Sequence, residues 1–484
     1  MVSTGWSGSP ERAITDPRTD PFHPTGAART LLLVPSMTLD GDGLAKIPGV
    51  EHYEERFLAF LHLLRDPATR LILITSTTPP PDLVHDTLTA FGCLPARDRL
   101  TLLDCADPSP RPLTEKVLRR PDLVAALRGR RPDTLIAFTG TALERELATR
   151  TGAALFATDP HLAPLGSKTG SRRTFAAAGV PTAPGHDGLR DLPDVLDALT
   201  ALRTDDPTTE KALIKLNDSF GAGGNVLFPY AGAPITGLRA WVERELPTRA
   251  AFASPPDTWD AYAPKITQMG AVVERYLTGD ATTSPSAQVL IDPTGTRVLS
   301  THDQVLSGQV FTGATAPADP AYRTTLLDHA HRVARRLHTA GALGIASVDF
   351  IATRHGTRWD LHALEVNLRM GGGTAPHFLA HGLLRGTHTD DGALLAADGT
   401  PRAYYATDRV LRPEYADLTP ADVLTALRPE RFDGTTGTTP YMLGALSIGR
   451  FGLLTIGHDV RDATHRFHRA VDAVDARTHP VPSG

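Results

Sequence analysis

The sequence has no apolar run that could cross a membrane. A helix that spans a bilayer needs about 18–20 apolar residues in a row, and no stretch of the chain comes near that length. The segment Met1–Pro17 also lacks the apolar centre of a secretory signal. We therefore expect a cytoplasmic protein without a membrane partner.

The chain has no excess of positive charge, and it has little cysteine. The formal net charge is −5 at pH 7, so the chain does not attract polyanions and a nucleic-acid partner is not expected. The two cysteines, Cys93 and Cys105, are too few for a disulfide framework and lack the spacing of metal ligands. We expect both to be buried and unreactive.

The first third of the chain alternates between apolar strands and helices. Residues 1–27 are rich in Ser, Gly, Pro and Thr without periodicity, which predicts a disordered tail. Strands are predicted at 30–34, 70–75, 99–103 and 134–138, and helices at 52–64 and 82–91. Continuous apolar strands between helices are typical of a parallel sheet covered on both faces. We therefore predict a small α/β domain at residues 28–162.

From about residue 163 the strands come in hairpins. The predicted hairpins are 287–291 with 296–300, and 344–352 with 360–369, and a helix is predicted between them at 321–339. This pattern indicates an α+β domain at residues 163–400. The remainder, 401–484, has a predicted helix after Pro420, strands around 441–448 and 453–456, and a helix at 461–474. These elements predict a small α+β C-terminal domain.

The second hairpin carries polar side chains on one face. Side chains of a strand alternate between its two faces, so three polar residues share one face and three apolar residues share the core face. The polar residues are Glu365, Asn367 and Arg369, and the apolar residues are Leu364, Val366 and Leu368. A turn centred near Thr357 would place Asp349 directly across from Glu365.

Carboxylate and amide oxygens on one surface suit Mg²⁺ that is also held by phosphates, and a guanidinium can grip a phosphate oxygen. The alternative is the exposed face of a solvated sheet, where such a triplet arises by chance. The triple glycine Gly371, Gly372 and Gly373 follows at once, and its N–H groups could bind an anion. The alternative is a flexible turn.

Lys215 lies on a predicted strand that leads into a glycine-rich loop, residues 218–225. The ammonium could contact a phosphate while the loop closes over it. The loop lacks the endings of a Walker motif and of a dinucleotide fingerprint. The apolar strand 271–277 and the lone Lys168 are weaker signals. Taken singly, they indicate a core strand and a solvated surface lysine.

In combination these motifs resemble the ATP-grasp superfamily across residues 165–377. The resemblance implies ATP bound between two α+β lobes, with a lid at about 211–277, and two Mg²⁺ ions. It places the following residues: Lys168 and Lys215 on the phosphates, Ser219, Gly221, Gly223 and Gly224 in the covering loop, Glu274, Tyr276 and Leu277 at the adenine hinge, Asp280 near the ribose, and Asp349, Glu365 and Asn367 on the metals. Lys215 and Arg369 would stabilise the transferring phosphoryl group, and Arg369 with Gly371, Gly372 and Gly373 would contact substrate.

One departure concerns Ser347. Many members of the superfamily have arginine two residues before the metal-binding aspartate, where this chain has serine. The role of that arginine passes either to Arg369 or to Arg275.

A second resemblance covers nearly the whole chain. The segments that carry it are 34–36, 49–56, 111–116, 165–168, 302–313, 441–446 and 449–452. Together they resemble the pheganomycin-type peptide ligases, which have a pre-ATP-grasp domain, an ATP-grasp core and a distinctive C-terminal domain. This group joins amino acids or peptides in bacterial natural-product pathways.

The resemblance implies that a carboxylate is converted to an acyl-phosphate and then attacked by an amine. Glu54 and Arg56 are candidate substrate contacts on what we expect to be a surface helix. The alternatives are a kinase acting on a hydroxyl, a carboxylase, which usually needs a biotin carrier, and a non-catalytic nucleotide-binding regulator. The chain has no Met-Lys-Met biotin acceptor. The sequence leaves the substrates, the general base and the oligomeric state open, a homodimer included.

Overall fold

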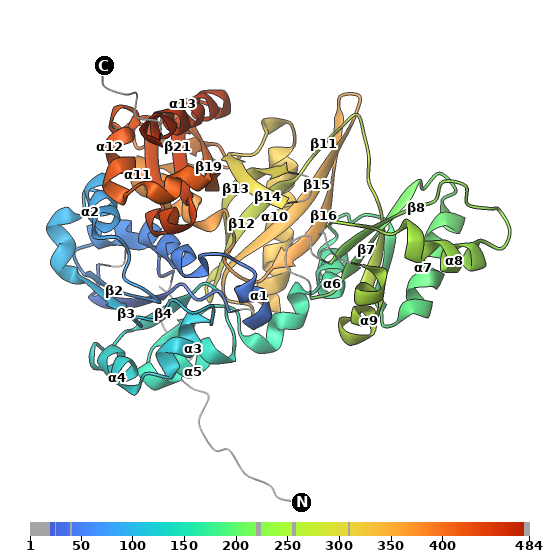
Figure 1. Cartoon of the computed structure of the whole chain (residues 1–484), viewed down its shortest axis with the longest axis horizontal. Coiled ribbons are helices and arrows are strands. Elements are labelled where there is room, and N and C mark those ends of the chain that lie inside the picture. The colour runs from blue at the N-terminus through green and yellow to red at the C-terminus, as the bar shows by residue number, and fades with distance from the viewer. Residues whose placement is uncertain are drawn as a thin grey trace, which may run out of the picture.

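The structure, a computed structural model, describes residues 20–24, 26–38, 41–218, 224–253, 258–307 and 310–478 (Figure 1). Most of the predicted tail lies outside these residues. Within them, no helix is both long and apolar enough to cross a membrane. The described chain forms three β-sheets with helices packed on them.

The first sheet is parallel, as predicted. Its strands are β1 (Arg29–Val34), β2 (Thr69–Thr75), β3 (Leu100–Asp104), β4 (Thr134–Ala137) and β5 (Ala154–Phe156), in the order β3-β2-β1-β4-β5. Leu31 and Leu33 of β1 enter one apolar core, and Leu32 and Val34 enter another. Both faces of the sheet are therefore covered, which explains why these strands read as continuous apolar runs. The helices around it are α1 (Gly41–Ala45), α2 (Pro81–Ala90), α3 (Leu113–Leu118), α4 (Pro121–Gly129) and α5 (Ala142–Thr151), with the short 3-10 helix η2 (Leu94–Arg99).

The helix predicted at 52–64 is a long 3-10 helix, η1 (Val50–Arg65). Most of its residues are buried, including the charged Glu54, Glu55 and Arg56. The expectation of a surface helix is therefore wrong. The reason is that η1 packs between the first sheet and the C-terminal part of the chain, which adds a second buried face that the sequence does not reveal.

The second sheet has its own core at one end of the molecule (Figure 1). Its strands are β6 (Gly185–Leu189), β7 (Lys211–Leu216), β8 (Asn225–Pro229), β9 (Ala251–Phe252) and β10 (Ala271–Arg275), in the order β6-β10-β7-β8-β9. Helices α7 (Leu192–Asp205), α8 (Leu238–Arg249) and α9 (Trp259–Met269) pack against it. Between the first and second sheets the chain passes through η3 (Pro160–Gly166) and α6 (Lys168–Ala178).

The third sheet contains both predicted hairpins. Its main strands are β11 (Ala281–Thr283), β12 (Pro285–Asp292), β13 (Gly295–Ser307), β14 (Val310–Ala316), β15 (Gly344–His355), β16 (Arg358–Asn367) and β19 (Pro401–Leu411). Helix α10 (Pro320–Thr339) matches the helix predicted at 321–339 and packs on one face of the sheet, and α11 (Thr374–Leu384) packs on η1. The short strands β17 (Thr387–His388) and β18 (Leu394–Leu395) lie at its edge.

The C-terminal residues extend this third sheet. Strand β19 pairs with β14 on one side and with β21 (Arg450–Gly457) on the other, and β20 (Gly437–Tyr441) pairs with β21. The sheet therefore crosses the predicted domain limit near residue 400, and the division into domains stays a prediction. Helices α12 (Pro420–Ala426) and α13 (Val460–Thr478) are close to their predicted positions.

One C-terminal prediction is wrong. The strand expected through 441–448 ends at Tyr441, and residues Leu443–Ile448 form the 3-10 helix η6. Met442 turns the chain with a φ of 56°, in the left-handed region. A side chain at Gly444 would meet Glu55 and His52 of η1. Close packing against η1 thus overrides the apolar pattern of this segment.

Candidate functional site

The hairpin β15–β16 brings the predicted metal-binding residues together. Asp349 pairs with Glu365 and Ser347 pairs with Asn367 in the antiparallel ladder. The turn is tighter than predicted, because His355 pairs with Arg358 across only two residues. A β-bulge between the Asp349 and Phe350 pairs absorbs the extra residue.

Because of the bulge, the residues of β16 that face the core differ from those predicted. The extra residue of the bulge is Leu364, which is only half-buried, whereas Val366 is 1% exposed and lies in the core beneath α10. Leu368 lies beyond the strand and is half-buried against the same core. Of the three apolar residues predicted to share a core face, Val366 alone fully occupies it. Without the bulge, Glu365 would face α10 with Ala363.

Asp349 sits at the centre of the polar face. Its carboxylate accepts hydrogen bonds from Ser286 Oγ (2.7 Å), Asn367 Nδ2 (3.0 Å) and Gln304 Nε2 (3.3 Å). Burial raises the pKa of Asp349, against the hydrogen bond from Ser286 and the nearby positive charge of Lys168. A buried carboxylate with a raised pKa is a site that a bound cation would stabilise.

Two lysines face this polar surface from different elements. Lys168, the first residue of α6, forms an ion pair with Glu365. Burial and the positive charge of Lys215 lower the pKa of Lys168 to about 8. The Lys168 N–H donates to the carbonyl of Asn217, which follows β7, so α6 begins beside the strand that carries Lys215. Two lysines from adjoining elements suit a polyanion lying between them.

Lys215 projects from β7 and pairs with Glu274 of β10, with 2.5 Å between Nζ and Oε2. Arg172 pairs with the other carboxylate oxygen at 2.6 Å. Burial would raise the pKa of Glu274, but Lys215 and Arg172 outweigh it and hold that pKa below its usual value. The Glu274 carboxylate is therefore ionised and held by two cations. Its backbone lies in the sheet between β6 and β7, and its predicted contact with adenine stays a prediction.

The rest of the predicted hinge lies at the edge of an open crevice. Arg275, Tyr276 and Leu277 line a space of about 840 Å³ beside the tip of the β15–β16 hairpin. The Asp280 N–H donates to the Arg354 carbonyl at 2.8 Å, and its carboxylate accepts from the Gly356 N–H at 2.7 Å. Its predicted contact with ribose stays a prediction.

The structure describes the triple glycine in full but only part of the glycine-rich loop. Ser219, Gly221 and Gly223 lie outside the described residues. The Gly224 carbonyl accepts hydrogen bonds from the Leu216 N–H and the Tyr262 hydroxyl. Gly371, Gly372 and Gly373 lead directly into α11. A side chain at Gly372 or Gly373 would press on Phe311 or His302, so these positions admit only a minimal backbone.

The chain has serine at position 347, and two other arginines were considered as replacements for the arginine found there in many relatives. Arg369 donates to Asn367 Oδ1 at 3.2 Å and so lies beside the metal-binding set. Arg275 instead pairs with Asp206 at 2.5 Å. Ser347 itself is 4% exposed opposite Asn367. Of the two candidate arginines, Arg369 therefore lies beside the predicted metal-binding residues, and its role there stays a prediction.

Several residues that touch this site were not found from the sequence. Ser286 on β12 and Gln304 on β13 hydrogen-bond to Asp349, and Arg172 on α6 fixes Glu274. The only signal for Ser286 is its polar side chain, alternating with Ala287 and Val289 along a buried strand. Nothing local marks Arg172, because its partner lies about one hundred residues away.

The donor set fits Mg²⁺ that arrives with a nucleotide. The described residues contain no group of three His, Cys, Asp or Glu side chains that could hold a metal ion by themselves. Asp349, Glu365 and Asn367 offer two carboxylates and one amide, which leaves ligand positions for phosphate oxygens and water. The two buried lysines provide matching charge for those phosphates.

Comparisons with known proteins agree with this geometry. The IQCH-like ATP-grasp family matches residues 244–388. The L-propargylglycine–L-glutamate ligase of Streptantibioticus cattleyicolor is 33% identical over 482 residues, covering 96% of this chain and 97% of the relative.

Two solved structures share the fold at low identity. A biotin carboxylase from Campylobacter jejuni has a TM-score of 0.55 and 12% identity, over 94% of this chain and 96% of its own. An N5-carboxyaminoimidazole synthetase from Staphylococcus aureus has a TM-score of 0.52 and 13% identity, over 92% and 98%. Given its motifs, its fold and its full-length relative, the chain belongs to the ATP-grasp superfamily and, within it, to the pheganomycin-type peptide ligases, and it is therefore an ADP-forming carbon–nitrogen ligase that uses ATP and Mg²⁺.

Proposed function

We propose that this ligase joins the carboxylate of one amino acid or peptide to the amine of a second amino acid through an acyl-phosphate. The observation that carries the proposal is the polar face of β15–β16, where Asp349 and Glu365 pair directly and Arg369 adjoins Asn367. Charge stabilisation concentrated at one place favours phosphoryl transfer to a substrate bound beside it.

Each residue of the site has a role in this proposal. Lys168 and Lys215 exchange their carboxylate partners for nucleotide phosphates. Asp349, Glu365 and Asn367 hold Mg²⁺, which neutralises charge on the transferring phosphoryl group. Arg369 is the catalytic cation of the chain itself, placed by its hydrogen bond to Asn367. Tyr276, Leu277 and Asp280 bind the nucleoside, and Gly371–Gly373 give substrate close access to the backbone.

The reaction then runs in two balanced steps. A carboxylate oxygen of the first substrate attacks the γ-phosphorus, and the bond to ADP breaks. The amine nitrogen of the second substrate attacks the acyl carbon, the carbon–oxygen bond breaks, phosphate leaves, and the amine proton passes to solvent or a base. The atoms of the carboxylate are thus divided between amide and phosphate.

The relative's name states that it joins L-propargylglycine and L-glutamate. We propose the same class for this chain: a small apolar L-amino acid as one partner and L-glutamate as the first amine to test. ATP dependence favours a cytoplasmic location. A homodimer is a further proposal, which light scattering of the purified protein can decide.

The test is condensation of L-amino-acid pairs in the presence of ATP and Mg²⁺, detected by mass spectrometry. A carboxylate partner labelled with ¹⁸O should deliver one labelled oxygen to the released phosphate, and ADP should form in step with amide. Formation of AMP and pyrophosphate would contradict the acyl-phosphate route. A phosphorylated product without free phosphate would instead support the kinase alternative.

A further inference from the structure

Two motifs of the sequence that the nucleotide site leaves unused meet in space. They are the segment 49–56 in η1 and the segment 441–452, which covers η6 and the start of β21. Glu55 accepts a hydrogen bond from the Gly444 N–H at 3.1 Å, and His52 Nε2 lies 3.3 Å from Ser447 Oγ. The contact joins the first domain to the C-terminal residues.

At the centre of this contact, two guanidinium groups share one carboxylate. Arg56 pairs with Asp408 Oδ2, and Arg450 pairs with Oδ1 at 2.9 Å. The three residues are only 7–8% exposed. Two cations and one anion leave an excess of one positive charge in a poorly solvated place, which is costly unless an anion joins them.

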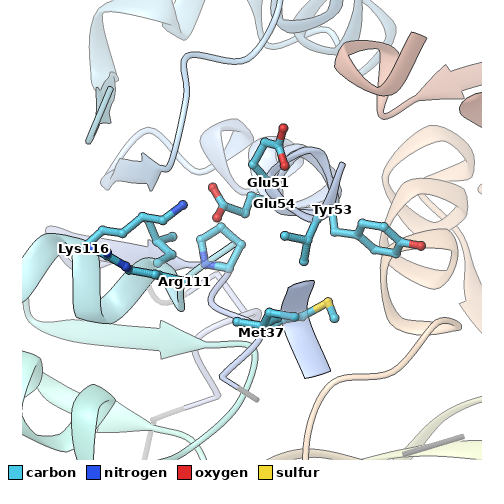
Figure 2. Close-up of a pocket in the computed structure, with 10 residues that line it drawn as sticks. Met37, Glu51, Tyr53, Glu54, Arg111 and Lys116 are labelled. Carbon is cyan, nitrogen blue, oxygen red and sulfur yellow. The ribbon is translucent and has the colours of Figure 1, made fainter. Parts of the chain in front are cut away.

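The arginines also stack on one aromatic ring. Their guanidinium carbons lie 4.2 Å (Arg56) and 4.8 Å (Arg450) from the centre of the Tyr53 ring. Figure 2 shows Tyr53 directed away from Glu54 and Lys116, which line a cavity of about 10 Å³. That cavity has room for about one water molecule, so it is too small for a substrate. The stack instead fixes the planes of both guanidinium groups.

Both arginines keep unused donors. Within the described residues, Arg56 has one hydrogen bond, from its Nη2 to Asp408. Arg450 uses Nε and Nη2, which donate to the backbone carbonyl and carboxylate of Asp408. The remaining N–H groups have no acceptor in that part of the chain. Rigid, planar donors with excess positive charge are suited to bind a carboxylate.

This group adjoins the reaction centre. Asp408 follows Thr407 on β19, and the Thr407 hydroxyl donates a hydrogen bond to the Thr312 carbonyl of the paired strand β14. The ring of the neighbouring Phe311 lies where a side chain at Gly372 of the triple glycine would be. Strands β14 and β19 thus connect the arginine pair to the glycines that follow Arg369.

We propose, on the basis of the ligase function above, that Arg56 and Arg450 bind the free α-carboxylate of the amino acid that supplies the amine. In an α-amino acid a single carbon separates the amine from that carboxylate, so holding the carboxylate also positions the nucleophile. The reacting carboxylate of the other substrate belongs beside Asp349 and Arg369. Asp408 orients the two guanidinium groups without cancelling their charge.

The experiment compares two nucleophiles for the same acyl-phosphate. Amide formation with L-glutamate needs the α-carboxylate subsite, whereas hydroxamate formation from hydroxylamine does not. In Arg56→Gln and Arg450→Gln, the KM for L-glutamate should rise about ten-fold or more, the size expected for losing charge-assisted hydrogen bonds. The ratio of hydroxamate to amide should rise by a similar factor.

The ligand provides the matched control. The wild-type protein should prefer L-glutamate over L-isoglutamine, in which the α-carboxylate is a carboxamide, and Arg450→Gln should lose that preference. Arg409→Gln, at an exposed arginine next to Asp408 on β19, should keep it. If Arg450→Gln melts early, Arg450→Lys replaces it, because lysine keeps the charge and loses the planar fork.

An unchanged preference for L-glutamate over L-isoglutamine in folded variants would overturn the subsite and leave the ligase function standing. Loss of hydroxamate and amide in equal measure would also overturn it, because the arginines would then serve activation of the carboxylate. Absence of ADP-coupled hydroxamate in the wild-type protein would instead reject the proposed function itself.

Discussion

Asp349 is surrounded by neutral hydrogen-bond donors as well as by cations, which distinguishes it from an ordinary buried ion pair. Ser286, Asn367 and Gln304 hold its oxygens in fixed positions, while Lys168 pairs with Glu365 rather than with Asp349. The site is thus organised around one carboxylate whose charge is only partly compensated. Residues that add ligands around it should matter for turnover more than for stability.

We predict that Glu365→Gln and Asn367→Ala lower kcat by two orders of magnitude or more, about the loss seen when one group that stabilises transition-state charge is removed. Both side chains lie on the half-buried site face, and Val366 keeps the core packed. Turnover at saturating Mg²⁺ is measured beside the melting temperature. A folded variant with near-normal turnover would remove that residue from the metal site.

Lys215→Ala should weaken ATP binding and also destabilise the protein. The substitution leaves the buried Glu274 carboxylate with Arg172 as its remaining cation, and breaking a buried pair costs about 3–5 kcal/mol. The double variant Lys215→Ala, Glu274→Gln should recover the stability without recovering ATP affinity. Calorimetric ATP titration and thermal melting separate the two effects, with the exposed Lys46→Ala as control. Full affinity in Lys215→Ala would contradict its role.

Among the residues of the site, local pattern was most informative along β16. The alternation of Glu365, Asn367 and Arg369 was enough to predict a shared face, because strand geometry has a period of two. Ser286, Gln304 and Arg172 could not be found, because their partners are remote in sequence. The fit of Arg369, rather than Arg275, near Ser347 likewise needed the fold.

At the scale of elements, α11 carries a buried group of histidines. His377 and His381 of α11 lie near His62 and His388, with ring centres 5.7–6.0 Å apart. Burial lowers the pKa of His62 to about 3 and that of His388 to about 4, and it lowers the pKa values of His377 and His381 as well. The charged groups that face them are the cations Arg65, Arg297 and Arg323, which add to the effect.

We predict that the free energy of unfolding falls as the pH drops below about 6.5. The unfolded histidines then take up protons, whereas the folded His62 and His388 stay neutral until about pH 3–4. Each histidine that is protonated only in the unfolded chain adds up to about 1.4 kcal/mol per pH unit to the slope of the unfolding free energy against pH. Urea unfolding from pH 7.5 to 5 measures the slope, and His377→Leu should reduce it. An unfolding free energy that does not change between pH 7.5 and 5 would contradict the prediction, because it would mean that the protonated histidines find hydrogen-bond acceptors in the folded protein.

Elements were predictable where local pattern and packing agree. Strands β1 to β4 of the first sheet and helices α2, α10 and α13 follow their predicted ranges, because each has one dominant periodicity, whereas the short strand β5 was not predicted. The turn of β15–β16 was misplaced because a bulge is compatible with the same pattern. Residues 443–448 became η6 because contacts with η1, nearly four hundred residues away, decide their backbone.

At the scale of the whole molecule, the first sheet and the C-terminal strands share a core. One apolar cluster includes Leu31 and Phe57 together with Phe378 and Phe451. The second sheet has a separate core, which contains Val195, Ile214 and Trp241. The sequence predicted the fold class correctly, but it did not show that the C-terminal strands complete the third sheet, since strand pairing across ninety residues leaves no local trace.

We predict that hydrogen exchange will separate these two cores. Amides of β6, β7, β8 and β10 should exchange through an opening that leaves β1, β2, β19 and β21 protected, because each core can be exposed without the other. MgATP should slow exchange in β7 and β10, which carry Lys215 and Glu274. Mass-spectrometric exchange gives both results. Equal opening free energies in all eight strands would mean that the chain unfolds as one unit.

The contact between η1 and η6 has a consequence for the exchange of parts among related ligases. Arg56 and Arg450 both pair with Asp408. A chimera that replaces only the C-terminal strands would therefore combine the Asp408 and Arg450 positions of one enzyme with the η1 helix of another. The two regions therefore have to be exchanged together, although they lie far apart in the sequence. Transplanting residues 49–56 together with 401–457 should therefore move amine preference between family members, whereas transplanting either region alone should yield an inactive hybrid.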